Sequence, residues 1–379
     1  REVRIGFIST MGGGPWGGSE TLWYKMACYL QELGHEVSAS VFKWPQIPNP
    51  IIGLSKNGTS VHFRKRTTIE GTKGKGIGFF NKIAFGKSDL LRIMKDKPDV
   101  LFFSLGSAFD LSAEPYASFV ANLKIPYFVY LSLNTEYEIL PFPQYQLQRD
   151  IFKNAKNVFF PSFRNLETAK RQLCTNLNNG VVINNPITFN STAEMPFLNS
   201  DVISFASVAR LDAFVKGQGV LLEIFSKKEW HNRKWKLNIY GKGNDEKYLM
   251  ELSKFYKLED RVSFFGHVND IRSDIWANNH VLLMPSQYEG CPISLYDAAI
   301  CSRPSVVSDV GGNAEFVENG FNGYVAEAPS VKSFGASMEK LWQSKNEMEE
   351  FGKNARKKAL SILDLSPEKT IIQKFILPN

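Results

Sequence analysis

Glu289 and Asp297 are two acidic residues eight positions apart, and their neighbours in the chain favour a binding site. The apolar run 281–285 before them is typical of a buried parallel strand, and a helix is expected after them, with Pro292 suited to its first turn. Free backbone N–H groups at the start of a helix attract anions, and carboxylates accept hydrogen bonds from hydroxyls. The segment therefore predicts a site, at the carboxyl end of a strand, for a phosphate flanked by two sugars. An ordinary strand, loop and helix with a capping carboxylate is the alternative interpretation.

Residues 286–298 resemble the signature of the retaining family 4 glycosyltransferases, also called glycosyl transferases group 1, whose members have the GT-B fold. That signature is an acid, seven residues and a second acid, usually Glu, whereas Asp297 is one methylene shorter. The resemblance implies an α/β protein with two doubly wound, Rossmann-like domains that face each other across a cleft. It also implies transfer of a sugar from a nucleoside diphosphate donor to an acceptor hydroxyl, with retention of the anomeric configuration and without a metal.

Arg210 and Lys216 match the same family in order and place. Arg210 follows an apolar run at 202–208, and Lys216 is followed by Gly217. Departure of a nucleoside diphosphate builds up negative charge, which fixed cations stabilise. Arg offers a planar fork for two phosphate oxygens, while Lys offers a point charge. An exposed Arg and Lys on a solvated loop are the alternative.

Glycine-rich turns after several predicted strands resemble other parts of the family's donor site. The turn 12–20 contains five glycines after the first strand, and Gly18 or Ser19 can cap the helix that follows. A dinucleotide fingerprint is the rival interpretation, but its spacing fits poorly and no paired acid ends the next strand, 36–42. Two later turns, at 241–243 and 266–268, resemble the turns beside the donor nucleoside.

The resemblance implies specific roles for these residues. Arg210 and Lys216 would stabilise the leaving diphosphate, Glu289 would bind hydroxyls of the donor sugar, and Asp297 would bind the ribose. The leaving phosphate itself would take the acceptor proton, so no protein base is named. The expected catalytic residues are Arg210, Lys216 and Glu289; further donor contacts are expected at Gly17, Gly18, Gly241, Gly243, His267, Val268, Gly290, Cys291, Pro292, Ile293 and Asp297.

The expected enzyme is a hexosyl- or N-acetylhexosaminyltransferase of glycan, glycolipid or polysaccharide biosynthesis. No cofactor is expected, since the nucleotide-sugar is a substrate, and a UDP-sugar is favoured over a GDP-sugar. The acceptor would be a carbohydrate, a lipid-linked molecule or another small molecule.

One departure from the family is a missing histidine. Many relatives carry a His at the carboxyl end of a middle strand of the first domain, but the strand predicted at 127–131 leads to Asn134, which cannot act as a base at neutral pH. This departure and Asp297 keep two alternatives open. One is a non-catalytic sugar-nucleotide-binding subunit, and the other is a sugar-nucleotide epimerase or phosphorylase on the same scaffold.

Apolar runs and helical patterns alternate along the chain in two series. Such alternation indicates parallel sheets with helices on both faces. The strands are expected near 3–9, 36–42, 60–63, 100–104, 127–131, 157–160 and 181–183, and then near 202–208, 236–240, 262–265, 280–284, 305–308 and 323–326; helices include 81–95, 163–173 and 366–377. Residues 1–190 would form an acceptor-side domain, 200–360 a donor-binding domain, and 361–379 a helix that crosses back to the first domain.

Composition agrees with a folded two-domain enzyme. The chain has 379 residues, 43% of them hydrophobic, and contains neither a signal peptide nor an apolar run of membrane-spanning length. Its four cysteines lack metal-ligand or redox spacing, which favours a reducing cytosol.

Positive charge is concentrated in residues 51–100, which hold eleven Lys and Arg against four Asp and Glu and also carry several aromatic residues. Such a segment could rest on an anionic membrane, which predicts a cytoplasmic protein at the inner face of the membrane. A solvated loop beside a helix is the alternative. No motif accompanies the charge, so nucleic acid is not an expected partner.

Overall fold

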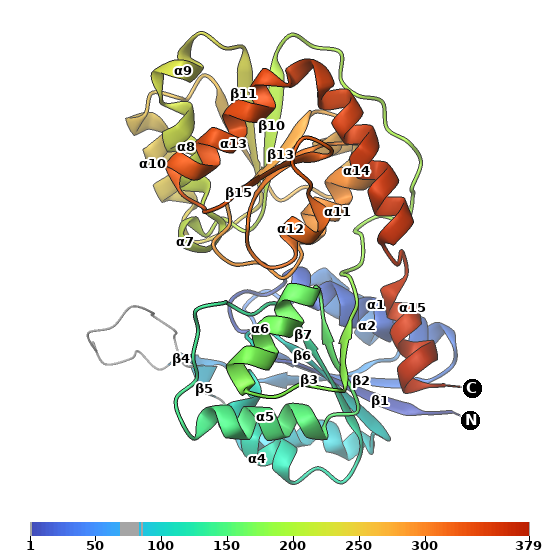
Figure 1. Cartoon of the computed structure of the whole chain (residues 1–379). Coiled ribbons are helices and arrows are strands. Elements are labelled where there is room, and N and C mark those ends of the chain that lie inside the picture. Colours follow the sequence, from blue (N-terminus) through green and yellow to red (C-terminus); the bar gives the residue numbers. More distant parts are fainter. Residues whose placement is uncertain (1, 69–82, 85, 379) are drawn as a thin grey trace. The chain divides into compact units, whose positions relative to one another are not determined.

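The computed structural model describes residues 2–68, 83–84 and 86–378, which form two compact units (Figure 1). Unit 1 comprises Arg1–Pro186 and Ser366–Asn379, and unit 2 comprises Ile187–Leu365. Each unit is a parallel sheet with helices on both faces, as the alternating pattern predicts, so the expected α/β class is confirmed.

Unit 1 contains a seven-stranded parallel sheet in the order β3-β2-β1-β6-β7-β8-β9. Its central strands are buried on both faces, which explains why the sequence presents them as nearly continuous apolar runs. The strands are β1 (Arg4–Ser9), β2 (Glu36–Phe42), β3 (Ser60–Arg64), β6 (Val100–Leu105), β7 (Tyr127–Leu131), β8 (Val158–Phe160) and β9 (Gly180–Val182). A short antiparallel pair, β4 (Thr67–Thr68) and β5 (Ile83–Ala84), stands apart from this sheet.

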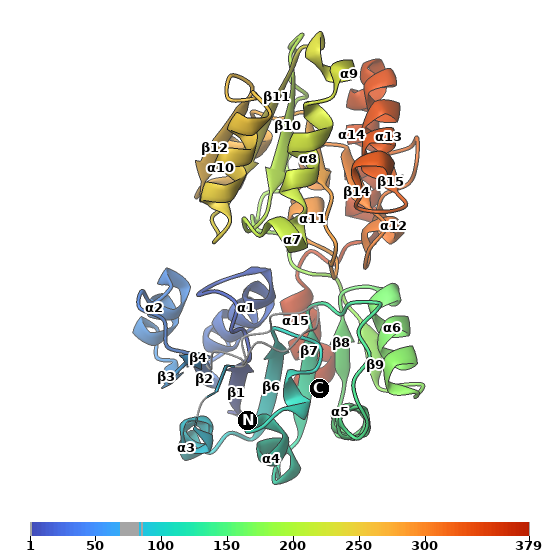
Figure 2. The same ribbon diagram turned by 90° about the vertical axis from the view of Figure 1, so that its left-hand side faces the viewer.

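The helices of unit 1 pack on both faces of its sheet (Figure 2). One face is covered by α1 (Gly18–Glu32), α2 (Asn49–Lys56) and α15 (Pro367–Ile371) with its continuation η5 (Ile372–Ile376). The other face is covered by α3 (Lys87–Leu91), η1 (Arg92–Asp96), α4 (Tyr116–Ala121), α5 (Gln144–Asn154) and α6 (Phe163–Leu173), with η2 (Asp110–Ser112) alongside.

Helix α15 joins unit 1 after the chain has passed through unit 2. Ile371 and Ile372 are fully buried among apolar residues of α1 and the sheet. The Phe375 ring meets the Phe159 ring edge-on at 5.2 Å, and Nε2 of Gln373 donates to the Tyr29 hydroxyl at 2.8 Å. These contacts fasten the C-terminal segment to the first part of the chain.

Part of the basic segment 51–100 lies outside the described residues. The expected helix 81–95 is wrong at its start, because Ile83–Ala84 form strand β5; α3 and η1 cover positions 87–96, and 81, 82 and 85 lie outside the described residues. Residues 69–82 and 85, which include three of its lysines and most of its aromatic residues, are not described. The expected membrane contact of this segment therefore stays a prediction.

Unit 2 contains a six-stranded parallel sheet in the order β12-β11-β10-β13-β14-β15. Each strand lies within two residues of its predicted position. The strands are β10 (Ile203–Val208), β11 (Trp235–Tyr240), β12 (Val262–Gly266), β13 (Val281–Met284), β14 (Ser305–Ser308) and β15 (Gly323–Ala326).

The helices of unit 2 form two layers as well. One apolar layer includes α8 (Gln218–Phe225), α9 (Lys228–His231), α10 (Glu246–Phe255) and α13 (Val331–Gln343). The other includes η3 (Ile271–Trp276), α11 (Ile293–Ile300), α12 (Asn313–Phe316) and α14 (Met348–Ile362). Two short helices complete the unit: α7 (Ala213–Lys216) and η4 (Lys345–Glu347).

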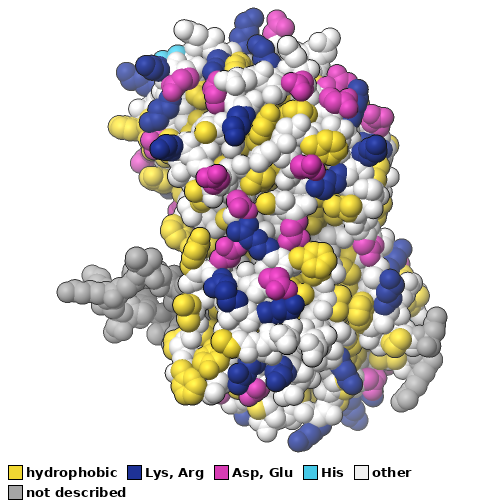
Figure 3. Space-filling view, in the orientation of Figure 1, with side chains coloured by type: hydrophobic (Ala, Val, Ile, Leu, Met, Phe, Trp, Pro, Cys, Tyr) yellow, Lys and Arg dark blue, Asp and Glu magenta, His cyan; other side chains and the backbone are white. Residues whose placement is uncertain are grey.

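The surface in Figure 3 carries charges of both signs side by side, with no field of a single sign. Within the described part of the chain, no helix is both long enough and apolar enough to span a bilayer.

Candidate functional site

Four adjacent strands of unit 2 end at the edge where most of the predicted site residues lie. The strands β12, β11, β10 and β13 are neighbours and parallel, so their carboxyl ends meet at one edge. His267 follows β12, Gly241 follows β11, Arg210 follows β10, and residues 286–293 follow β13. Ligands of open α/β sheets bind at such an edge.

Lys216 and Glu289 form the central contact of this edge. Nζ of Lys216, at the end of α7, lies 2.7 Å from Oε1 of Glu289, in the loop before α11. The two side chains are 17% and 6% exposed. Two adjacent strands thus bring a cation and an acid 73 positions apart into direct contact. Because little solvent reaches this pair, removal of either group would leave the other buried without a compensating charge.

Arg210 is the more accessible cation. Its side chain is 42% exposed, and Nη2 lies 3.0 Å from Oδ2 of Asp212. Asp212 in turn caps α7 by accepting from the backbone N of Val215 at 3.0 Å. The Arg210 carbonyl accepts from Nε2 of Gln218 at 2.9 Å, which fixes the backbone, and an anion would have to replace Asp212 as the partner of the guanidinium.

Gly217 allows the Lys216 loop to pass close to the chain after β13. Its φ is +68°, and a Cβ atom there would lie 2.1 Å from the Pro285 carbonyl oxygen. The Gln287 backbone N donates to the Val215 carbonyl at 2.8 Å, which ties the same two loops together. Only glycine at position 217 lets the two loops come close enough for Lys216 to contact Glu289.

Gly241 and Gly243 have a packing role in the structure. Cβ atoms on these residues would lie 2.0 Å from the Ala209 carbonyl oxygen and 2.1 Å from that of Leu211. The turn thus packs against the loop that carries Arg210. The expected donor contact of the two glycines stays a prediction.

The loop before α11 brings together the other expected donor contacts. Gly290 is buried, Pro292 is the N-cap of α11, and Ile293 is its first helical residue. The Gly290 carbonyl accepts from the backbone N of Gly312 at 2.5 Å, which fixes the loop. Cys291 is 3% exposed, and burial raises the pKa of its thiol to about 12. A thiol this hard to ionise is a poor nucleophile at neutral pH.

Asp297 is engaged by the chain itself. Its Oδ1 accepts from the backbone N of Thr188 at 2.9 Å, and its Oδ2 accepts from the Thr188 hydroxyl at 2.5 Å. Asp297 is 3% exposed, whereas Thr188 lies near the start of unit 2 and is exposed. A ribose would have to displace Thr188 to use these oxygens, so the ribose role stays a prediction.

His267 and Val268 follow β12 at the outer end of the site. His267 is exposed, and Val268 packs against the apolar layer beside α11. Beside them, the Phe265 ring stacks on Tyr240 at 4.9 Å.

Gly17 and Gly18 belong to unit 1, where α1 begins after β1. The N-cap is Gly17, with no side-chain cap, so the expectation that Gly18 or Ser19 caps α1 is wrong. The Ser19 hydroxyl instead lies 3.5 Å from the Met11 sulfur. Gly17 has an extended backbone, and a Cβ atom there would lie 2.6 Å from the Met11 methyl carbon.

Asn134, which lies near the position of the missing histidine, forms hydrogen bonds with Asn165 inside unit 1. Its Nδ2 donates to the Asn165 carbonyl at 2.9 Å, and its Oδ1 accepts from Nδ2 of Asn165 at 2.7 Å. The residue is buried. It therefore positions the loop after β7 on α6.

Two acids at the carboxyl edge of the unit 1 sheet, the buried Glu20 and the half-buried Asp110, escaped the sequence interpretation. Burial raises the pKa of Glu20, which accepts from the Ser9 hydroxyl at 2.8 Å, to about 7. Burial likewise raises the pKa of Asp110 to about 6, and this carboxylate accepts from the Thr10 hydroxyl at 2.5 Å. An acid in the first turn after a glycine-rich loop was a usable signal for Glu20, but nothing in the sequence places Asp110 beside Thr10.

Comparison with known proteins agrees with this geometry. Residues 193–358 match the family described as glycosyl transferases group 1. The amylovoran biosynthesis glycosyltransferase AmsD of Erwinia amylovora is 32% identical over 39% of the chain and 41% of its own length. The UDP-Gal:alpha-D-GlcNAc-diphosphoundecaprenol alpha-1,3-galactosyltransferase of Escherichia coli is 33% identical over 25% of each protein. The matched stretches span less than half the length of the curated relatives.

The whole chain resembles solved structures in fold. The crystal structure of Anabaena Alr3699/HepE in complex with UDP-glucose superposes with a TM-score of 0.73, covering 98% of this chain and 99% of that one at 17% identity. The two parallel-sheet units thus have the GT-B arrangement of elements that the sequence predicts. The stretch that matches glycosyl transferases group 1, residues 193–358, includes Arg210, Lys216, Glu289 and Asp297.

Proposed function

We propose that this protein is a glycosyltransferase that moves a sugar from a nucleoside diphosphate donor to an acceptor hydroxyl, with unit 2 binding the donor. The observation that carries the proposal is the 2.7 Å contact between Lys216 and Glu289, beside the exposed Arg210, at the carboxyl edge of a family-matched sheet. The edge holds cations for a diphosphate and an acid for sugar hydroxyls within one small region.

Lys216 and Glu289 could each exchange the other for a group of the donor when the donor binds. A bound diphosphate would take the Lys216 ammonium, and the donor-sugar hydroxyls would take the Glu289 carboxylate that Lys216 now contacts. Arg210 would add a bidentate contact to the phosphates. As the bond to the sugar breaks, negative charge grows on the diphosphate, and both cations then bind it more strongly.

Retention of configuration and independence of metal are part of the proposal. Cys291, two positions from Glu289, has a thiol that burial keeps neutral, so this thiol is a poor nucleophile. We infer that the acceptor oxygen bonds to the anomeric carbon on the face from which the diphosphate leaves, and that this diphosphate takes the acceptor proton. Attack on that same face conserves the anomeric configuration.

We propose UDP as the nucleotide of the donor and a glycan or lipid-linked glycan as the acceptor. The E. coli relative is named for UDP-Gal and a diphosphoundecaprenol acceptor, and the Erwinia relative for amylovoran biosynthesis. The fold neighbour from Anabaena was crystallised with UDP-glucose. The hexosyl or N-acetylhexosaminyl identity of the sugar belongs to the same proposal.

Thermal unfolding with UDP-, GDP-, ADP- and CMP-sugars tests the donor site. A ligand that binds only the folded state raises the free energy of unfolding, by about 2.7 kcal/mol when its free concentration is 100 times its Kd. The Tm rises as a result. We expect a rise with UDP-sugars that is lost in Arg210→Ala and retained in Lys254→Ala. Lys254 is an exposed cation at the end of α10 and serves as the matched control.

Transfer is tested by incubating the donor with lipid-linked and soluble glycan acceptors and determining the anomeric configuration of the product by NMR. A retained configuration in the presence of EDTA supports the proposal, and inversion contradicts it. Donor binding without transfer to any acceptor favours the binding-subunit alternative. Epimerised or phosphorolysed donor without acceptor favours the epimerase or phosphorylase alternative.

A further inference from the structure

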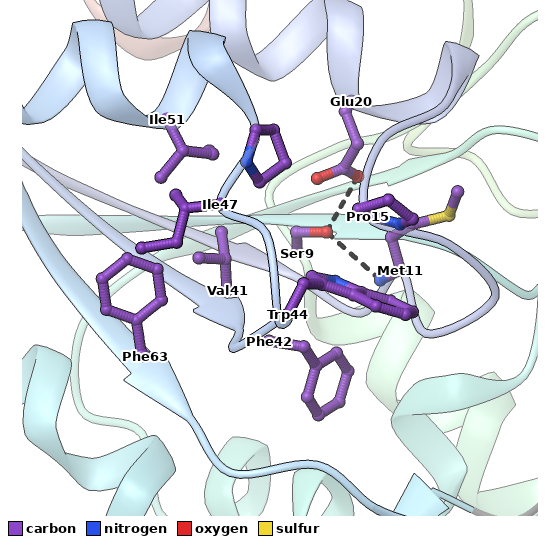
Figure 4. Close-up of a pocket in the computed structure, with 11 residues that line it drawn as sticks. Ser9, Met11, Pro15, Glu20, Val41, Phe42, Trp44, Ile47, Ile51 and Phe63 are labelled. Atoms are coloured by element: carbon purple, nitrogen blue, oxygen red, sulfur yellow. Dashed lines mark hydrogen bonds between the residues drawn. The ribbon is translucent and has the colours of Figure 1, made fainter.

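Ser9 ends β1 and Thr10 follows it, and the hydroxyl of each lies between a carboxylate and a backbone N–H group. The Ser9 hydroxyl donates to Oε1 of Glu20 at 2.8 Å and accepts from the backbone N of Met11 at 3.1 Å (Figure 4). Ser9, Met11 and Glu20 line a small, mostly apolar pocket of unit 1 at the carboxyl ends of β1, β2 and β3. We call these contacts the Ser9 bridge, and they fix the backbone directly before the glycine-rich turn 12–20.

Thr10 forms a second bridge, on the other face of the sheet. Its hydroxyl donates to Oδ2 of Asp110 at 2.5 Å and accepts from the backbone N of Gly106 at 2.7 Å. Oδ2 of Asp110 also accepts from the backbone N of Ser107 at 2.9 Å. The backbone N of Thr10 donates to the Ser104 carbonyl at 2.9 Å, as in the strand before it. Successive side chains of a strand point to opposite faces, so α1 supplies the acid of the Ser9 bridge and η2 supplies the acid of the Thr10 bridge.

Met11 contacts both the loop after β6 and the far end of the glycine-rich turn. A Cβ atom on Gly106 would lie 2.8 Å from Cα of Met11, so the two loops leave no room for a side chain there. At the far end of the turn, a Cβ atom on Gly17 would lie 2.6 Å from the Met11 methyl carbon, and the Ser19 hydroxyl lies 3.5 Å from the Met11 sulfur. The position of Met11 therefore determines how closely Gly17 approaches, and with it the shape of the turn.

Both acids lie where ionisation is unfavourable, which argues against a simple packing role. Glu20 is buried and Asp110 is half-buried, and burial raises their pKa values to about 7 and about 6. An apolar side chain would fill either place without the cost of removing a carboxylate from water. Ionisable groups with such shifted pKa values occur preferentially at functional sites.

We propose that Glu20 and Asp110 are positioning residues, which hold the glycine-rich turn in the shape that binds the donor. Glu20 acts through the Ser9 hydroxyl and Asp110 through the Thr10 hydroxyl, and neither acid needs to touch the donor itself. A turn that is fixed in advance loses less conformational entropy when a ligand binds to it. The inference rests on the proposed function, for which two glycines of this turn are the expected donor contacts of unit 1.

A matched pair of variants at Thr10 tests whether the bridge fixes the turn. Thr10→Val keeps the shape of the side chain and removes the hydroxyl, whereas Thr10→Ser keeps the hydroxyl. The readout is the methyl NMR signal of Met11 in the full chain, labelled with carbon-13 at its methionine methyl groups and assigned through Met11→Leu. We expect Thr10→Val and Ser9→Ala to shift or broaden this signal, and Thr10→Ser to leave it at the position of the parent.

A double-mutant cycle tests whether each acid acts through its hydroxyl. With the donor and acceptor that give transfer, Thr10→Val and Asp110→Leu should each lower kcat/KM about tenfold, the effect of about 1.4 kcal/mol. The double variant should also lose about tenfold, because both substitutions remove the same bridge. Ser9→Ala and Glu20→Leu should follow the same rule. A loss of about a hundredfold in either double variant would show that the acid acts independently of the hydroxyl, and would overturn the proposal.

Ser118→Ala is the matched control. This substitution removes another unit 1 hydroxyl that donates to a carboxylate, here from α4 to Oε1 of Glu114 at 2.6 Å. We expect the Met11 signal and kcat/KM to stay as in the parent. A Met11 signal that does not respond to Thr10→Val, or that responds equally to Ser118→Ala, would contradict the positioning role.

Failure of this inference can be distinguished from failure of the proposed function. Transfer by the parent with unchanged kcat/KM in Thr10→Val and Asp110→Leu rejects the positioning role and leaves the proposed function intact. Absence of donor binding and of transfer in the parent rejects the proposed function. The Met11 signal does not depend on the reaction, so it decides in either case whether the two bridges fix the turn.

Discussion

Gly217 and Gly320 offer a matched pair of substitutions in unit 2, because both have a positive φ and only one lacks room for a side chain. The φ angle is +68° at Gly217 and +71° at Gly320. A Cβ atom on Gly217 would lie 2.1 Å from the Pro285 carbonyl oxygen, whereas nothing lies within 4 Å of one on Gly320. Replacing each by Ala separates the cost of the backbone conformation from the cost of the collision.

The left-handed conformation costs an L-residue about 1–2 kcal/mol, and Gly320→Ala should lose that amount alone. Gly217→Ala should lose it too, and its backbone must also move by about 1 Å to restore an ordinary carbon–oxygen contact. Forced shifts of this kind cost about 1–3 kcal/mol. We therefore expect Gly217→Ala to lose about 2–5 kcal/mol in total.

Differential scanning calorimetry measures the difference. At about 2–4 °C per kcal/mol for a unit of this size, the Tm should fall by about 2–8 °C in Gly320→Ala and by about 4–20 °C in Gly217→Ala. Because Lys216 precedes Gly217, stabilisation by UDP-sugar should also be weaker in Gly217→Ala and unchanged in Gly320→Ala. Equal falls in Tm, or an intact UDP-sugar effect in Gly217→Ala, would refute the steric reasoning.

Three other predictions concern buried ionisable groups. The folded pKa of Glu20 is about 7, above its ordinary 4.5. Its contribution to stability is therefore greatest below pH 4.5 and is lost as the pH rises to 7. Measured by urea unfolding, Glu20→Gln should be more stable than the parent by up to about 3 kcal/mol at pH 8 and by much less at pH 5. Burial lowers the pKa of His280 from 6.5 to about 4, and its Nδ1 accepts from the backbone N of Ser204 at 3.0 Å. The stability that neutral His280 provides should therefore fall as pH drops from 6.5 to 4, and an imidazole NMR signal that titrates near pH 6.5 would contradict this. Burial raises the pKa of Cys291 to about 12, so iodoacetamide at pH 8 should modify the exposed Cys174 first, as peptide mass spectrometry can measure.

The strands and several helices were predictable because their signals are local. Buried parallel strands read as apolar runs, and β2, β7, β14 and β15 lie where those runs predict. Helix α6 has the predicted bounds, since the Ser162 hydroxyl caps its start and Cys174 ends it in a left-handed conformation.

Contacts between segments far apart in the chain could not be predicted from local sequence patterns. The approach of Lys216 to Glu289 was anticipated only through the family resemblance, and no spacing rule joins them. Thr188 binds Asp297 across 109 positions, from a segment without periodicity, so the engagement of this acid was hidden. The apolar pocket of unit 1 likewise depends on three strand ends whose residues show no shared pattern.

The return of α15 to unit 1 sets an order for folding during synthesis. Residues 187–365 leave the ribosome before Ile371 and Ile372, the residues that complete the apolar layer over α1. Unit 2 can therefore reach its full set of contacts while unit 1 still exposes part of its core. A nascent chain stalled between these two stages would present that uncovered layer to chaperones, although every strand of its first sheet had already been made.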